Sequence, residues 1–111
     1  MVKITYIYSV VVLADGNHVL SGGREGKIRR WRIEDGKEVG TAMDARGPVF
    51  SIAVLRNGKV IVSGTENGLA TVWNVESHSK VAEFKGHSGW VTVTLQLGWV
   101  LLTSRQTERK S

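Results

Sequence analysis

Short apolar runs separated by polar turns dominate this chain, and they predict β-strands. In the second half, Asn57-Gly58 separates one apolar run from the next. A pair of this kind tolerates the positive φ that tight hairpins require. Runs of five to seven residues rich in Val, Ile, Thr and Trp have the length and composition of strands. We therefore expect four strands in this region, over residues 49–55, 60–64, 69–75 and 80–84.

Several of these runs are apolar on both faces, for example residues 10–13 and 60–62. A strand exposed to water on one side alternates apolar and polar residues, whereas a strand covered on both sides is apolar throughout. We therefore expect each sheet to lie between two neighbouring sheets.

The strand pattern repeats with a spacing of 42 residues. Four-stranded repeats of about 40 to 45 residues are typical of β-propeller blades. The sequence thus predicts an all-β fold of antiparallel, four-stranded propeller blades. The positions that recur are Leu13, Gly16, Ser21, Gly22, Gly26, Trp31, Glu34 and Val39, which correspond to Leu55, Gly58, Ser63, Gly64, Gly68, Trp73, Glu76 and Val81.

The repeat divides the chain into an N-terminal strand extension (1–6), a first unit (7–48), a second unit (49–90) and a partial, degenerate third unit with a basic tail (91–111). In the third unit, strands are expected over 91–95 and 99–103. A closed propeller needs at least four blades, roughly 170 residues at this repeat length. We therefore expect an incomplete, open propeller that exposes a strand edge and an apolar sheet face.

The Ser-Gly pair, the following Gly and the Trp of each unit, together with Gly86-His87, resemble the motifs of the WD-repeat family. The resemblance covers roughly residues 7–97. In that family a His, a Ser or Thr, an Asp and a Trp form a structural hydrogen-bonded network in each blade. The chain departs from this pattern at the Asp position, which holds Glu25 or Asn67, and after each Trp, where Arg32 and Asn74 stand. The resemblance implies that both tryptophans lie in the core. It implies a structural role for Ser21, Gly26, Trp31, Ser63, Gly68, Trp73, Gly86 and His87.

The net charge of +5 is unevenly distributed, because five basic residues crowd the segment from Arg24 to Arg32. A basic strip of this kind can attract phosphate backbones, but a solvated strand face is the simpler interpretation. Within the strip, Arg30 corresponds to Val72, whose position is predicted to be buried. We expect the Arg30 guanidinium to reach solvent or to pair with Glu25 or Glu34.

Composition argues against most catalytic and cofactor chemistry. The chain has no Cys, which excludes disulfides and thiolate sites and fits an intracellular, cytoplasmic or nuclear location. The three histidines lack metal-ligand spacing, and the segment 21–27 departs from the phosphate-loop pattern at two positions. We expect no enzyme activity, no metal and no cofactor. No apolar run approaches the roughly 18 residues of a membrane span, so no membrane association is expected.

The resemblance implies a non-catalytic protein–protein interaction scaffold. Its partners would dock on the loops between the fourth and first strands and between the second and third strands. The partners expected are other proteins, with further propeller blades or self-association as possibilities. The alternatives are a basic nucleic-acid-binding surface and a fragment of a longer repeat protein without separate activity. The candidate protein-binding residues are Arg24, Arg46, Glu66 and Trp90.

Overall fold

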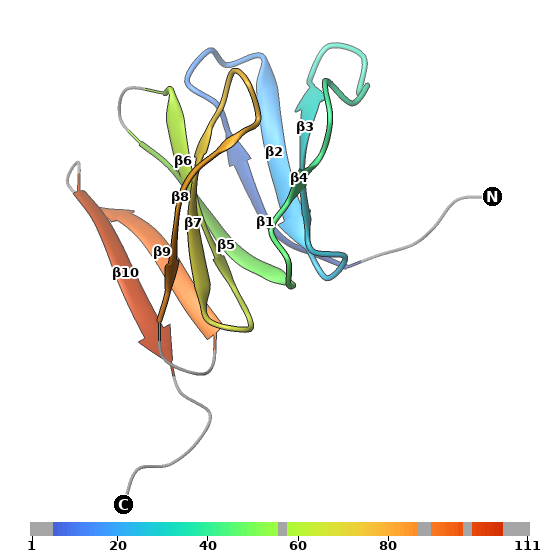
Figure 1. Ribbon diagram of the computed structural model, residues 1–111. Coiled ribbons are helices and arrows are strands. Elements are labelled where there is room, and N and C mark those ends of the chain that lie inside the picture. The colour runs from blue at the N-terminus through green and yellow to red at the C-terminus, as the bar shows by residue number, and fades with distance from the viewer. Residues whose placement is uncertain (1–5, 56–57, 87–89, 97–98, 106–111) are drawn as a thin grey trace, which may run out of the picture.

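The computed structural model describes residues 6–55, 58–86, 90–96 and 99–105, the last two segments by their backbone. These residues form ten strands in three antiparallel sheets (Figure 1). Blade 1 contains β1 (Ile7–Val12), β2 (His18–Gly23), β3 (Lys27–Arg32) and β4 (Met43–Asp44) in that order. Blade 2 contains β5 (Val49–Val54), β6 (Val60–Thr65), β7 (Leu69–Asn74) and β8 (Lys80–Lys85). The third sheet pairs β9 (Trp90–Gln96) with β10 (Trp99–Arg105).

The three sheets are stacked like the blades of a fan, with blade 2 between blade 1 and the third sheet (Figure 1). β9 lies against β5 and β6, while β1 and β2 lie against β5 from the other side. The expected fold class, all-β with antiparallel four-stranded blades in an incomplete propeller, is therefore confirmed. The part of the chain that the structure describes contains no helix long and apolar enough to cross a membrane.

The two complete blades share the same internal register. Val10 pairs with Ser21 in blade 1, and Ile52 pairs with Ser63 at the corresponding position of blade 2. Both first strands have an irregularity at the same place, between Ile7 and Ser9 and between residues 49 and 51. The register shows that the 42-residue spacing of the sequence is a true structural repeat.

The fourth strand of blade 1 is much shorter than its counterpart in blade 2. Only Met43 and Asp44 form β4, and a single bridge joins Trp31 to Glu38 before it. Between them lies Gly40, whose φ of 75° is incompatible with an extended strand. The corresponding residue of blade 2 is Ala82, which continues β8. Each unit therefore has the four strands expected of it, but the fourth strand of blade 1 is reduced to two residues.

The main apolar core lies between blade 1 and blade 2. Leu20 and Ile28 of blade 1 and Ile61 of blade 2 are fully buried there, and Trp73 is 3% exposed. A second cluster, formed by Ala53, Val62 and Ala70, involves β5, β6 and β7 of blade 2. Blade 2 therefore has apolar cores on both of its faces.

The other face of blade 1 is uncovered. Trp31 is only half-buried, so its assignment to the core is wrong, and Ile33 is 52% exposed. Val10 and Val12 of β1 are also exposed. We call this surface, formed by Val10, Val12, Val19, Trp31 and Ile33, the open face; it is the apolar sheet face that an incomplete propeller was expected to expose.

Candidate functional site

One end of the molecule gathers the loops of both blades, and hydrogen bonds join them. The Ala45 amide donates to the Gly26 carbonyl at 2.8 Å, which ties the β4–β5 loop to the β2–β3 turn of the same blade. The Glu66 amide donates to the Pro48 carbonyl at 2.9 Å, which ties the same loop to the β6–β7 turn of blade 2. We call this end of the molecule the loop end.

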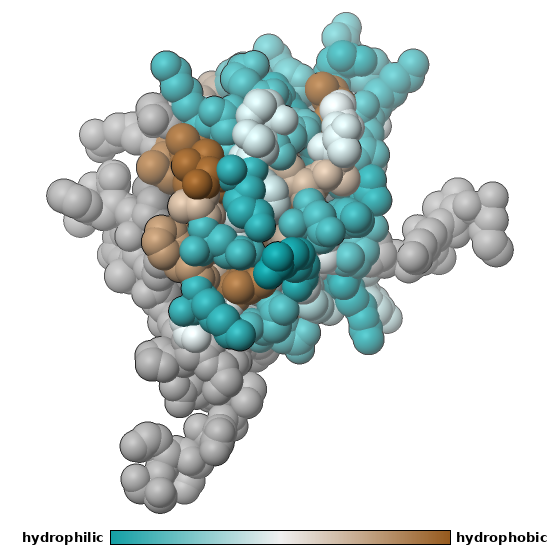
Figure 2. Space-filling model, viewed as in Figure 1, coloured by the Kyte–Doolittle hydropathy of each residue, from teal (hydrophilic) through white to brown (hydrophobic). Residues whose placement is uncertain are grey.

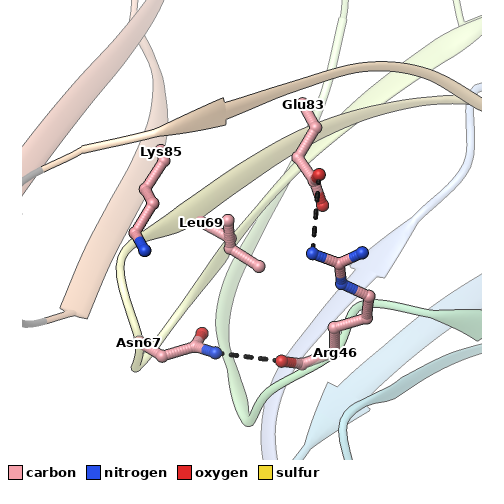
Figure 3. A pocket seen from close by; sticks show the side chains of 5 residues that line it. All are labelled: Arg46, Asn67, Leu69, Glu83 and Lys85. Carbon is pink, nitrogen blue, oxygen red and sulfur yellow. Dashed lines mark hydrogen bonds and ion pairs between the residues drawn. The ribbon is translucent and has the colours of Figure 1, made fainter.

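Asn67 makes the most specific connection at the loop end. Its Nδ2 donates to the Arg46 carbonyl at 3.0 Å, as Figure 3 shows. Its Oδ1 accepts from the buried Thr65 hydroxyl, which also accepts from the Leu69 amide at 3.1 Å. Thr65 is fully buried and holds the β6–β7 turn, so it is not available to partners.

A pocket of about 290 Å³ opens beside this connection (Figure 3). Leu69 and Lys85 are cross-strand partners, and Glu83 lies one pleat further along β8. The residues that line the pocket are Arg46, Asn67, Leu69, Glu83 and Lys85.

The pocket contains two cationic side chains and one carboxylate. Arg46 Nη2 lies 3.7 Å from Glu83 Oε1, and its side chain is 57% exposed. Glu83 also pairs with Lys80 at 3.4 Å. Lys85 has no hydrogen-bond or ion-pair partner among the residues that the structure describes. Arg46 has a left-handed backbone, with φ of 64°, and its amide donates to Asp44 Oδ1 at 3.0 Å.

The four predicted contact residues are not all part of this pocket. Arg46 lines it, whereas Glu66 is exposed on the adjoining turn. Arg24 lies on the β2–β3 turn of the same end, with its guanidinium 5.7 Å from the centre of the Tyr6 ring. Trp90 is the first residue of β9, and its side chain lies outside the described residues.

Sequence reasoning missed Glu83 and Lys85, because only loops were searched for contact residues. Both belong to β8, and alternation along the strand places them on the same side. The charged residues at 80, 83 and 85 were the available signal. Their proximity to Arg46 depends on the packing of two blades, which has no local signature.

The residues predicted to have a structural role make equivalent hydrogen bonds and turns in the two blades. Trp31 Nε1 donates to Ser21 Oγ at 2.8 Å, and Trp73 Nε1 donates to Ser63 Oγ at 3.0 Å. Gly26 and Gly68 have φ of 83° and 89° in equivalent turns. The Gly86 amide donates to the Gly68 carbonyl at 2.8 Å. His87 lies outside the described residues.

Two of the five basic residues of the strip, Arg29 and Arg32, are ion-paired. Arg29 Nε donates to Glu25 Oε2 at 2.7 Å, and Arg29 Nη1 donates to Glu38 Oε2 at 2.9 Å. The hydrogen bond to Glu25 raises the pKa of Arg29 most, and the bond to Glu38 raises it further. Arg32 Nη2 donates to Asp35 Oδ2 at 3.0 Å. Among the described residues, no group of three or more His, Cys, Asp and Glu side chains could hold a metal ion.

Arg30 is partly exposed, as one of the two expectations for it allowed. Instead of a carboxylate, its Nη1 donates to the Val75 carbonyl of blade 2 at 3.1 Å. Its Nε is buried without a hydrogen-bond partner. Arg30 therefore crosses the interface between the blades and satisfies a backbone acceptor there.

Comparison with known proteins identifies the repeat. The family model described as "WD domain, G-beta repeat" matches residues 4–32 and 36–74. Among solved structures, the chain is similar to one titled "Structure of U3-55K" (TM-score 0.74, 22% identity, 82% of this chain and 30% of that chain covered). It is similar also to one titled "Crystal structure of RRP9 WD40 repeats" (TM-score 0.73, 23% identity, 82% and 29% covered).

At these identities the solved structures show the fold alone, and the chain spans about 30% of their length. A search of the curated proteins finds no match. The family model covers more than half of the chain. The chain therefore belongs to the WD-repeat family, whose repeats are generally protein-interaction scaffolds.

Proposed function

We propose that this chain is a non-catalytic interaction module that binds an acidic segment of a partner protein at the loop end. The observation that carries the proposal is the bond from Asn67 Nδ2 to the Arg46 carbonyl, which fixes the loop of one blade on the turn of the next. The Arg46 side chain nevertheless stays 57% exposed. A loop that is ordered before binding loses little conformational entropy when a partner docks.

The charges at the pocket favour a carboxylate ligand. Lys85 is unpaired within the described residues, and the 3.7 Å pair of Arg46 with Glu83 is half-exposed. Exposed pairs of this kind contribute about 0 to 1 kcal/mol, so Arg46 is available to an incoming carboxylate, which arginine can bind through two parallel hydrogen bonds. Leu69, 8% exposed, provides an apolar floor.

Arg24, Glu66 and Trp90 are proposed as contacts at the rim of the same end. Arginine and tryptophan are often the residues on which interface affinity depends. Arg24 and Glu66 project from turns that the β4–β5 loop joins, and Trp90 begins the strand that follows the β8–β9 loop. A partner segment that crosses the loop end from blade 1 to blade 2 would pass the turns that carry Arg24 and Glu66.

The basic strip supports nucleic-acid binding less well. Arg29 is engaged by two carboxylates and Arg32 by one, so their charges are largely compensated within the chain. A phosphate backbone would have to displace these partners. The second alternative, a fragment without separate activity, predicts no binding in the following experiment.

The proposal is tested by selecting a displayed peptide library on the immobilised chain. We expect the selected peptides to be enriched in Asp and Glu. Combined Arg46→Gln and Lys85→Gln should weaken their affinity by about tenfold or more, equivalent to about 1.4 kcal/mol. Lys37→Gln is the matched control, because Lys37 is exposed on the β3–β4 turn at the opposite end and the charge change per site is the same.

Peptides without acidic residues, or acidic peptides that bind the double variant equally well, would contradict the proposal. Duplex DNA and single-stranded RNA serve as additional probes. A submicromolar affinity for either that falls steeply with salt and is lost on Arg24→Gln would favour the nucleic-acid alternative.

A further inference from the structure

We infer that the outer edge of blade 2 binds the acidic partner segment as an added β-strand, paired with β8. The inference rests on the proposed function and specifies how the segment is held. β8 ends its sheet, and β7 is its only strand neighbour among the residues that the structure describes (Figure 1). An edge strand presents backbone N–H and C=O groups that an extended peptide can bind.

The register of β8 shows which of its backbone groups point outward. The Gly86 amide donates to the Gly68 carbonyl at 2.8 Å, so these two residues are a hydrogen-bonded pair of the ladder. Such pairs alternate with non-bonded pairs in an antiparallel sheet, and the register continues without a shift over this part of β8. The N–H and C=O groups of Lys85 and Glu83 therefore point away from β7, toward the outer edge.

The outer edge of blade 1 is blunted at the corresponding place. Its fourth strand, β4, has only two residues, and the positive φ of Gly40 interrupts the chain where Ala82 continues β8. Short, interrupted edge strands resist pairing with other chains. β8 has six residues. Of these two outer edges, the one in blade 2 is therefore the edge that can accept a further strand.

The side chains along β8 suit a strand with one acidic side. Glu83 and Lys85 line the pocket together with Arg46. Phe84 lies on the opposite side of β8 by alternation, and it is 54% exposed. An added strand alternates in the same way, so its acidic side chains would lie beside Lys85 and Arg46, and its apolar side chains would lie beside Phe84.

Charge favours an acidic segment over a second copy of the chain at this edge. β8 and the pocket contain three basic side chains, Lys80, Lys85 and Arg46, and one acidic side chain, Glu83, so positive charge is in excess by two. A second copy would bring the same excess to the edge, and like charges on paired strands repel. An acidic segment is complementary in charge.

Hydrogen exchange of the unmodified chain, measured by NMR, tests the inference directly. The probe is a capped seven-residue peptide in which glutamate and valine alternate. At saturating peptide, we expect the Glu83 and Lys85 amides to exchange at least about tenfold more slowly, because the added strand bonds the outward groups. The Phe84 amide faces β7 and should change much less. A matched peptide with lysine in place of glutamate should not slow the exchange.

Methylation of the peptide amides, one nitrogen at a time, tests the pairing from the other side. In an added strand, every second peptide amide faces β8. We expect methylation of these amides to weaken binding by about tenfold, and methylation of the amides between them to weaken it by less than about twofold. Docking through side chains alone would not produce this alternation.

Two substitutions of one residue separate the backbone from the side chain. Glu83→Pro removes an N–H that points away from β7, and proline is tolerated at such positions of edge strands. Glu83→Val removes the carboxylate and keeps the N–H. We expect Glu83→Val to bind the acidic peptide at least as tightly as the unmodified chain does, and Glu83→Pro to bind it about tenfold more weakly.

Binding of the acidic peptide without slower exchange at Glu83 and Lys85, or without alternation on methylation, would overturn strand addition and leave the proposed function standing. Equal slowing by the lysine peptide would contradict the acidic partner on which both rest. Failure of the acidic peptide to bind would overturn the inference, and the library selection then decides the proposed function separately. Slowing at the two amides as the chain concentration rises, without peptide, would assign the edge to a second copy and also overturn the inference.

Discussion

Trp31 and Trp73 occupy equivalent positions in the two blades but have different surroundings. Each donates to the serine of the neighbouring strand, at 2.8 and 3.0 Å. Trp73 is 3% exposed because blade 1 covers it, while Trp31 lies half-buried on the open face. The tryptophan–serine bond is therefore a property of one blade. Burial, and with it most of the hydrophobic stabilisation, is a property of two blades.

The same comparison explains where charges are tolerated. Blade 1 has Arg29 and Arg32 on its third strand, each paired with carboxylates. The equivalent residues of the covered blade are Thr71, which is 1% exposed, and Asn74. A buried ion pair loses more hydration energy than its mutual attraction easily restores. Arg29, which alternation places on the same face as Trp31, therefore keeps its ion pairs on the face in contact with water.

The largest expected difference between the blades is in tryptophan truncation. Trp73→Ala should destabilise the chain by roughly 3 to 5 kcal/mol, as the removal of a large buried aromatic does. Trp31→Ala should cost about half as much or less, because part of its ring is already hydrated. Urea unfolding followed by far-ultraviolet circular dichroism measures both. Equal losses would show that the open face is covered in solution.

A smaller effect is expected for the arginine that crosses between the blades. Arg30→Met removes the bond to the Val75 carbonyl, but it also removes the buried Nε that has no partner. These contributions oppose each other, and each is about 1 to 3 kcal/mol. We expect a net change within about 1 kcal/mol, compared by urea unfolding with Arg24→Met, which alters an exposed arginine. A loss above about 3 kcal/mol would mean that Arg30 holds the blades together.

The smallest effect concerns the turn after the third strand, where blade 1 has Asp35 and blade 2 has Ser77. Hydrogen bonds from Arg32, and then from the Lys37 amide, lower the pKa of Asp35 from 3.8. The ionised carboxylate is favoured in the folded state, so its contribution is present above the unfolded pKa and is lost as the pH falls through the folded value. Carboxyl titration by NMR should place this pKa below 3.8. Asp35→Ser should reduce the acid dependence of unfolding below about pH 4, and a normal Asp35 titration would contradict the ion pair.

Much of the blade architecture could be predicted because it depends on local chemistry. Gly16 and Gly58, with φ of 71° and 73°, mark equivalent hairpins, and the apolar runs between the turns form the strands. The shortness of β4 is also local, because the positive φ of Gly40 interrupts the outer edge of blade 1. The Arg30 contact could not be predicted, since its acceptor is a backbone carbonyl 45 residues away that has no mark in the sequence.

The surface over the outer strands is mostly hydrophilic, with small separate hydrophobic areas, in the view of Figure 2. The candidate contacts with a partner lie at the loop end, around the pocket that Arg46, Glu83 and Lys85 share. Packing of two blades creates that pocket, and a single repeat unit read by itself does not contain it.

Arg46 has a left-handed backbone with φ of 64°, a conformation that glycine adopts readily and that costs other residues roughly 1 to 3 kcal/mol. Glycine at this position would relax the loop, and it would also delete the guanidinium at the mouth of the pocket. Under the proposed function, stability and recognition thus make opposite demands on one residue. Selection for a more stable chain alone would replace this arginine, so the proposed binding would limit how far the loop can be stabilised.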